Sequence, residues 1–215
     1  NNFYTATVYE KGAEVVRMIH TLVGPDDFRR GSDLYFERFD GQAVTTDDFV
    51  ACMEQVSGLD LTQFKRWYTQ AGTPRLSVTD DYDADSQTYR LSFHQSCPAT
   101  PGQTDKLPFV IPVKLGLLGA DGNDLPIHTS ANYNAGTEVL TLADETTEVV
   151  FTGVSERPVP SLLRDFSAPV KLSFGYSDEQ LAFLAANDAN GFNRWDALQQ
   201  LYLRAILSMA TEHRA

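Results

Sequence analysis

The spacing of apolar residues changes twice along this chain of 215 residues, and that change constrains the fold more than any other feature. Up to about residue 72 the apolar positions follow a helical stripe, as at Val15 and Ile19. From about residue 74 they fall into short alternating runs, which are typical of strands. After about residue 176 the helical spacing returns. We therefore predict an α+β fold in three blocks: helices, an antiparallel β-sandwich, and the start of a second helical part.

Turn and capping residues predict where the helices begin and end. Gly24 and Pro25 should separate two helices, because glycine suits a C-terminal cap and proline suits the first helical position. Three further helix starts are predicted from capping boxes, in which a short polar residue is followed three residues later by an acid or an amide. These pairs are Thr45 with Asp48, Asp60 with Gln63, and Ser177 with Gln180.

The first strands are expected in two alternating runs, from Arg75 to Thr79 and from Tyr89 to Phe93. The acidic stretch Asp80 to Asp83 is interpreted as a polar turn between them. Its carboxylates, with Asp85, could suggest calcium, but the glycine and the closing glutamate of an EF-hand loop are absent. A solvated turn is therefore the expected structure.

Later strands follow the same pattern. Phe109 to Leu118 is a longer apolar run, and Val139 to Leu142 with Val149 to Phe151 is interpreted as a hairpin. Pro158 and Pro160 would interrupt a central strand, since proline cannot donate to a sheet. That segment is predicted to be an edge strand or a connector.

The charge and the cysteines narrow the classes of partner. The formal net charge is −12, from 29 acidic and 17 basic residues, so we expect no nucleic-acid partner. No apolar run is long enough to span a bilayer, so we expect no membrane insertion. Cys52 and Cys97 lie in different patterns and are expected to be free thiols, which suits a reducing, cytoplasmic location. The chain has no initiator methionine and no signal peptide, so we expect it to begin inside a longer chain.

Residue types alone identify no catalytic site. There is no H-E-x-x-H motif, no glycine-rich phosphate loop, and no set of nucleophile and base that can be assigned. The histidines are far apart and lack the spacing of metal ligands. They are His20, His94, His128 and His213.

One run nevertheless has a specific resemblance. Residues 9–13 (YEKGA), followed by residues 15–19 (VVRMI), resemble a signature of the aminopeptidase N family of zinc peptidases. Later motifs agree with it in the same order along the whole chain, and they resemble the bacterial branch. They are residues 67–74 (WYTQAGTP), 158–170 (PVPSLLRDFSAPV) and 194–197 (RWDA).

The resemblance implies an architecture. Residues 1–72 would be the C-terminal helical part of a thermolysin-like peptidase domain, residues 73–173 a β-sandwich domain, and residues 174–215 the start of a helical C-terminal domain. In this family the zinc motif, its third ligand and the motif that holds the substrate amine all precede the position of Asn1. The chain is therefore expected to be an internal fragment that lacks zinc ligands and is inactive alone.

The resemblance also implies an activity for the parent: zinc-dependent removal of N-terminal amino acids from peptides. Tyr9 would donate its hydroxyl to the oxyanion formed at the scissile carbonyl, since a phenol with a pKa of about 10 keeps its proton at neutral pH. Tyr4 would line the pocket for the first side chain, and Asn1 would border it. Glu10 and Lys11 are interpreted as a solvated pair. The expected partners are peptide substrates and the remaining domains of the same enzyme.

Two alternatives stay open. The chain could be a non-catalytic binding or interaction module built on the sandwich, which would require an exposed aromatic face. Phe93, Phe109 and Phe151 fit a buried face equally well. It could also belong to an inactive peptidase homologue, and the sequence before Asn1 would decide this.

Overall fold

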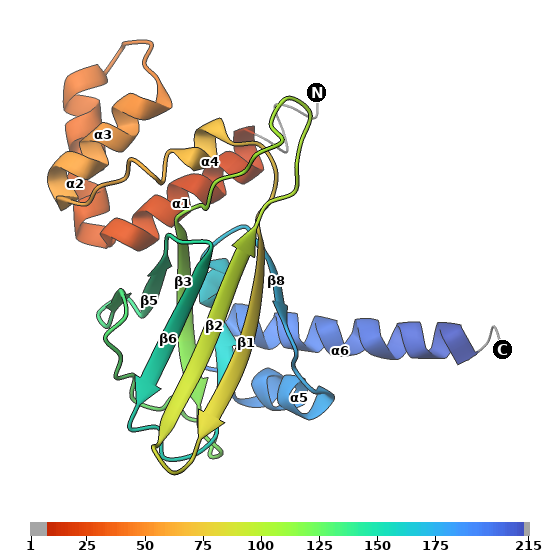
Figure 1. Cartoon of the computed structure of the whole chain (residues 1–215). Coiled ribbons are helices and arrows are strands. Elements are labelled where there is room, and N and C mark those ends of the chain that lie inside the picture. Colours follow the sequence, from red (N-terminus) through yellow and green to blue (C-terminus); the bar gives the residue numbers. More distant parts are fainter. Residues whose placement is uncertain (1–7, 213–215) are drawn as a thin grey trace.

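The structure is a computed structural model that describes residues 8–212. A block of helices lies over one end of two packed sheets, and two further helices lie beside the sheets (Figure 1). This arrangement agrees with the predicted fold class of helices, antiparallel sheets and further helices.

Four helices form the first block, and their ends follow the predicted caps. Gly24 ends the first helix with a φ of 83° and Pro25 begins the second. The capping box of Thr45 and Asp48 is present at the start of the third helix. These helices are α1 (Gly12–Val23), α2 (Pro25–Phe39), α3 (Thr46–Ser57) and the short α4 (Arg66–Thr69).

The capping box predicted from Asp60 and Gln63 is wrong. The Asp60 carboxylate instead accepts a hydrogen bond from the backbone of Thr62, two residues on, at 2.8 Å. The Gln63 amide donates to the carbonyls of Pro108 and Ala143, which belong to the sheet block. Because these distant carbonyls take the Gln63 side chain, the segment forms turns and α4 begins only at Arg66.

Two four-stranded sheets form the middle of the molecule. The first has the order β6-β2-β1-β8 and the second the order β4-β5-β3-β7. All neighbours are antiparallel except β1 and β8, which run parallel. The first sheet contains β1 (Arg75–Asp83), β2 (Thr88–Ser96), β6 (Thr146–Thr152) and β8 (Lys171–Phe174); the second contains β3 (Ile111–Leu118), β4 (Tyr133–Asn134), β5 (Val139–Leu142) and β7 (Val159–Leu162).

The polar turn predicted at Asp80 to Asp83 is wrong, because β1 continues through these residues. Asp83 pairs with Thr88 at the end of the hairpin. Asp80 accepts hydrogen bonds from Tyr89 at 3.0 Å and Arg157 at 2.9 Å. These partners stabilise an acidic residue inside a strand, which local polarity alone could not indicate.

The hairpin predicted from Val139–Leu142 and 149–151 is also wrong. The two strands belong to different sheets: β5 pairs with β3 and β4, whereas β6 pairs with β2. The edge position predicted for the segment with Pro158 and Pro160 is confirmed, since β7 is the outermost strand of its sheet.

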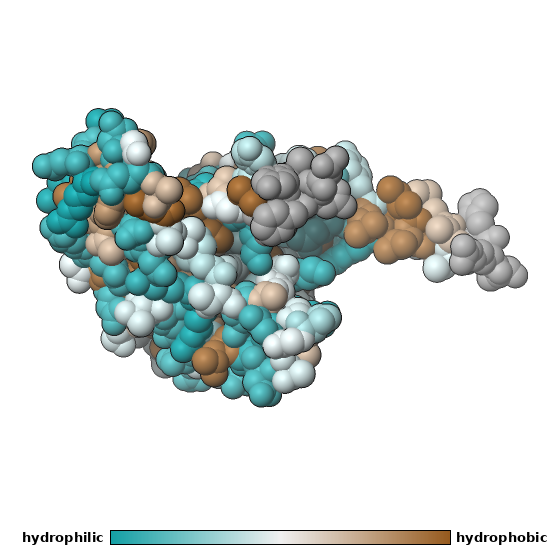
Figure 2. All heavy atoms as spheres, turned by 90° about the horizontal axis from the view of Figure 1, so that it is seen from above, coloured by the Kyte–Doolittle hydropathy of each residue, from teal (hydrophilic) through white to brown (hydrophobic). Residues whose placement is uncertain are grey.

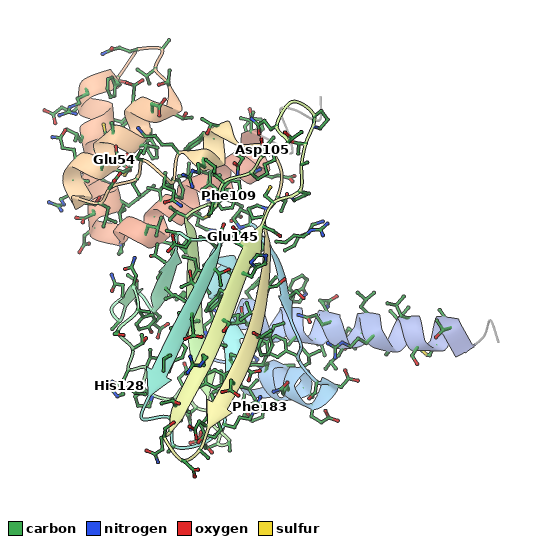
Figure 3. The ribbon with its side chains drawn as sticks, in the orientation of Figure 1. Glu54, Asp105, Phe109, His128, Glu145 and Phe183 are labelled. Atoms are coloured by element: carbon green, nitrogen blue, oxygen red, sulfur yellow. The ribbon has the colours of Figure 1, made fainter. Side chains whose placement is uncertain are left out.

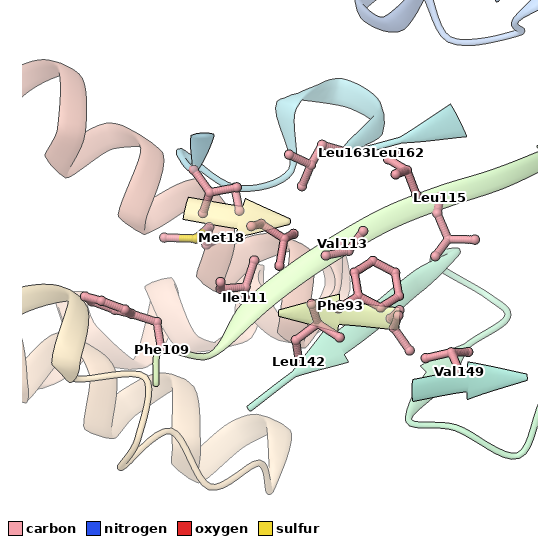
Figure 4. Close-up of a cluster of buried hydrophobic side chains, with 14 of the residues drawn as sticks. Met18, Phe93, Phe109, Ile111, Val113, Leu115, Leu142, Val149, Leu162 and Leu163 are labelled. Atoms are coloured by element: carbon pink, nitrogen blue, oxygen red, sulfur yellow. The ribbon is translucent and has the colours of Figure 1, made fainter. Parts of the chain in front are cut away.

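One continuous core joins the first helices to both sheets. Met18 from α1 lies in the same buried cluster as Phe93 and Phe109 (Figure 4). Trp67 of α4 packs on Phe109, with ring centroids 4.6 Å apart, and donates its indole N–H to the carbonyl of Val110 at 2.7 Å. The helical block and the sheets therefore stabilise each other by shared apolar burial.

Two helices follow the sheets, α5 (Asp178–Asn187) and α6 (Gly191–Glu212). The capping box of Ser177 and Gln180 is present. The far part of α6 projects from the molecule and carries apolar side chains on its surface (Figures 1 and 2). Its exposed apolar residues include Trp195, Tyr202, Leu203, Ile206, Leu207 and Met209. No helix within residues 8–212 is long and apolar enough to cross a membrane.

Both cysteines are free, as predicted. Cys52 is fully buried in α3, whereas Cys97 is only half-buried at the end of β2.

Candidate functional site

Tyr9 lies in a π-helical turn, residues 8–11, immediately before α1. The residue is 71% exposed. The hydroxyl of Tyr9 can therefore reach a molecule that binds at this end of the helix. Tyr4 and Asn1, the two other predicted site residues, lie outside the described residues.

Lys11, two residues after Tyr9, is not part of a solvated pair, and that expectation is wrong. The residue is half-buried, and its Nζ donates a hydrogen bond to the carbonyl oxygen of Gly72 at 3.0 Å. Burial lowers the pKa of Lys11, with a smaller opposite effect from Cys97. The bond joins the start of α1 to the junction between the helical block and the sheets.

The turn at Ala71 and Gly72 is itself held in place. Gly72 has a φ of +105°, which favours glycine, and an added Cβ would lie only 2.8 Å from the sulfur of Cys97. The Ala71 N–H donates to the side-chain oxygen of Gln103 at 2.8 Å, and Lys106 donates to the Ala71 carbonyl at 2.9 Å. The carbonyl of Gly72, which accepts the hydrogen bond from Lys11, therefore lies in a restrained turn.

The middle of α1 is attached to the sheet block by Arg17. Its guanidinium donates to the carbonyls of Asp165 at 2.7 Å and Phe166 at 2.6 Å, and it pairs with Glu14 at 2.6 Å. It also lies 5.8 Å from the centre of the Phe166 ring. Asp165 and Phe166 both have positive φ values, so Arg17 binds carbonyls that an unusual backbone conformation presents.

A cavity of about 420 Å³ lies beside this contact and is lined by basic and acidic residues together. Lys114 pairs with Asp165 at 2.8 Å, and this hydrogen bond is the main reason why the pKa of Asp165 lies below its usual value. Arg17 is bound to Glu14 and two carbonyls, as described above. Because these cations are already paired, the cavity does not indicate a binding site for an anion.

The described residues show no zinc-binding cluster. They contain no group of three or more histidine, cysteine, aspartate or glutamate side chains placed to bind a metal ion. Figure 3 shows the separation: Glu54 lies among the helices, whereas His128 lies toward the opposite end of the sheets. No metal-ligand set can therefore be assigned to these residues.

Sequence reasoning missed the hydrogen bond from Lys11 to Gly72. The lysine was part of the motif that identified Tyr9, but its acceptor, Gly72, lies 61 residues away. The one local sign was Gly72 itself, a glycine in the later motif at residues 67–74.

Known protein families match three successive parts of the chain. "Peptidase family M1 domain" matches residues 1–68, "Domain of unknown function (DUF3458) Ig-like fold" matches residues 72–175, and "Domain of unknown function (DUF3458_C) ARM repeats" matches residues 178–215.

Individual proteins match over nearly the whole chain. Aminopeptidase N of Escherichia coli is 48% identical over 214 residues, covering 100% of this chain and 24% of that protein. Aminopeptidase N of Caulobacter vibrioides is 44% identical, covering 98% of this chain and 23% of that protein. This chain thus spans about a quarter of the length of these curated relatives.

A solved structure has the same fold. The crystal structure of Legionella pneumophila aminopeptidase A in complex with aspartic acid superposes with a TM-score of 0.82 at 34% identity. The match covers 97% of this chain and 22% of that one.

Proposed function

Because the chain belongs to the aminopeptidase N family of M1 peptidases, we propose that it works as one segment of a longer zinc-dependent aminopeptidase, to which it contributes the hydroxyl of Tyr9. The observation that carries this proposal is the 48% identity to an aminopeptidase N over the whole chain. The exposed position of Tyr9 at the start of α1 supports its part in the reaction.

Tyr9 would act on the charge that develops during peptide-bond hydrolysis. Attack on the scissile carbonyl places negative charge on its oxygen, and a phenol can donate a hydrogen bond to that oxygen. Such a donor stabilises the transition state by about 3 to 4 kcal/mol. When bound in a peptidase, zinc polarises the carbonyl and activates water. The described residues contain no cluster of three or more side chains that could hold that zinc.

Tyr4 and Asn1 are proposed to line the pocket that receives the first side chain of the substrate. The scissile carbonyl of the substrate would then lie close to the N-terminal end of this chain, where Tyr9 precedes α1. Peptides and the remaining domains of the same enzyme are the proposed partners, and the two free thiols support a cytoplasmic location.

The proposed division into domains has boundaries near residues 72 and 173. The last helix of the first block ends at Thr69 and β1 begins at Arg75. At the other boundary, β8 ends at Phe174 and α5 begins at Asp178. These changes of secondary structure support the division.

The binding-module alternative has no support from the three phenylalanines considered for its aromatic face. Phe93, Phe109 and Phe151 are each 1% exposed and lie in the core. An inactive peptidase homologue is separated from an active one by kinetics and metal content.

The test is the substitution Tyr9→Phe in the zinc-loaded peptidase that contains this chain. The change removes one hydroxyl and keeps the ring, so kcat should fall roughly 10²- to 10³-fold with little change in KM. Tyr4→Phe is the matched control: it should alter KM or substrate preference by less than about tenfold, because pocket contacts discriminate weakly. A near-normal kcat for Tyr9→Phe, with unchanged zinc content and melting temperature, would refute the assignment.

A further inference from the structure

We propose that Lys11 is a positioning residue, which holds the hydroxyl of Tyr9 in place by fastening the Tyr9 turn to the Ala71–Gly72 turn. The inference rests on the proposed role of Tyr9 and adds a second residue to that role. Lys11 does not need to contact the substrate, since it would act only through Tyr9.

The first step is the attachment of the turn itself. Tyr9 lies in the π-helical turn at residues 8–11, with most of its side chain in solvent. Lys11 bonds the carbonyl of Gly72 at 3.0 Å across 61 residues of sequence. No other side chain of residues 8–11 makes a hydrogen bond to a distant part of the described chain. The position of this turn relative to the sheets therefore depends on Lys11 more than on its neighbours.

The second step is that the acceptor does not move freely. The backbone of Ala71 is hydrogen bonded on both sides, by Gln103 and Lys106, and Cys97 packs where a Cβ of Gly72 would lie. A hydrogen bond to a restrained carbonyl also restrains the side chain that donates it, here that of Lys11. Partly burying the charge of a lysine costs free energy unless the ammonium has a hydrogen-bond acceptor.

The third step is the dependence of the catalytic rate on the position of the Tyr9 hydroxyl. A displacement of about 1 Å at a catalytic group can lower a rate roughly 10²-fold. A turn that loses its attachment can shift by this amount without unfolding. The expected loss therefore appears in kcat, because substrate binding does not use the Tyr9 hydroxyl in the ground state.

The experiment uses Lys11→Met, which keeps an unbranched apolar stem and removes the ammonium, and Lys11→Arg, which keeps a donor. In the zinc-loaded peptidase that contains this chain, Lys11→Met should lower kcat about 10- to 100-fold with little change in KM, and Lys11→Arg should restore part of the loss. The matched control is Lys65→Met. Lys65 is a half-buried lysine of the same helical block that pairs with Asp47 at 3.5 Å, and its loss should leave kcat unchanged.

A double-mutant cycle separates this inference from the proposed function. If Lys11 acts through Tyr9, then Lys11→Met should cost little further kcat in a Tyr9→Phe background. Losses that add in full would overturn the inference while the role of Tyr9 stands. A normal kcat for Tyr9→Phe alone would instead overturn the proposed function.

A second readout does not depend on activity. Hydrogen exchange of the 215-residue chain should become faster at residues 8–14 in Lys11→Met, but not in Lys65→Met. Unchanged exchange at these residues, in a variant that folds, would show that Lys11 does not hold the turn and would overturn the inference.

Discussion

Replacing Arg164 with methionine tests the buried ionic cluster that joins the second sheet to the C-terminal helices. The guanidinium is 4% exposed and contacts two carboxylates. It forms two hydrogen bonds with Asp124, at 2.8 and 2.6 Å, and lies 3.3 Å from Asp188, whose side chain is fully buried. Ser161 also joins the cluster, since it donates to Asp188 and accepts from Arg164 at 3.0 Å.

The size of the stability loss depends on which partners each carboxylate keeps after Arg164 is replaced. Asp124 is 38% exposed and regains water, so its loss is small. Asp188 keeps the Ser161 hydroxyl and the backbone N–H of Asn190 but loses its cation in a buried site. Removing one partner of a buried pair costs about 3 to 5 kcal/mol. For a chain of this size each kcal/mol lowers the melting temperature by roughly 2 to 4 °C, which predicts a fall of about 6 to 20 °C.

The assay is thermal and urea-induced unfolding of the chain, with Arg90→Met as the matched control. Arg90 pairs with Glu148 on the surface, with side chains 43% and 54% exposed, so its loss should cost about 0 to 1 kcal/mol. Adding Asp188→Asn to Arg164→Met should recover stability, because it removes the uncompensated charge. An Arg164→Met variant as stable as the Arg90→Met variant would refute the reasoning.

Two further predictions concern metal content and pH. The chain by itself should bind no stoichiometric zinc and should not cleave an aminoacyl chromogenic substrate; zinc found by elemental analysis with chelator-sensitive turnover would contradict this. Burial, with a smaller effect of Asp47, raises the pKa of Tyr68 to about 12, and burial also raises the pKa values of Tyr89 and Tyr176. Unfolded phenols ionise near pH 10, so from about pH 10 upward the unfolded chain binds fewer protons and the free energy of unfolding should fall. Urea midpoints between pH 9 and pH 11 measure this fall, and Tyr68→Phe should make it shallower; a midpoint independent of pH would show the reasoning wrong.

Features encoded within four residues could be predicted from the sequence. The boundary at Gly24 and Pro25 is correct because each residue restricts its own backbone. The capping boxes at Thr45 and Ser177 are correct because each joins a side chain to a backbone N–H three residues away. Such interactions form where no distant partner takes either side chain.

Features that depend on distant partners could not be predicted from the sequence. The Asp60 box failed because Gln63 finds carbonyls 45 and 80 residues away. The strand at Asp80 to Asp83 was missed because Arg157, one of the partners of Asp80, lies 77 residues on. Alternation likewise identified β5 and β6 as strands without indicating that they belong to different sheets.

The candidate site divides in the same way. A short motif was enough to propose Tyr9, whereas the contact that would fix its position could not be predicted, because the acceptor of Lys11 belongs to another segment. Two further attachments of the helical block, Arg17 to the carbonyl of Phe166 and Trp67 to that of Val110, also end on backbone carbonyls. Hydrogen bonding to a backbone carbonyl does not itself require a particular side chain on the acceptor residue, so a pattern of side chains gives little sign of such a contact.

These hydrogen bonds to the sheet block allow the sheets to support the proposed chemistry, although no catalytic group is assigned to the sheets. The first helix is fastened at its start by Lys11 to Gly72, along its length by Arg17 to residues 165–166, and underneath by the shared core. A hydroxyl that must meet an oxyanion within hydrogen-bond distance needs a support that does not bend. A packed sheet block provides such a support, because interiors at crystalline density resist deformation. The sandwich would then serve as the fixed base against which the Tyr9 turn is set.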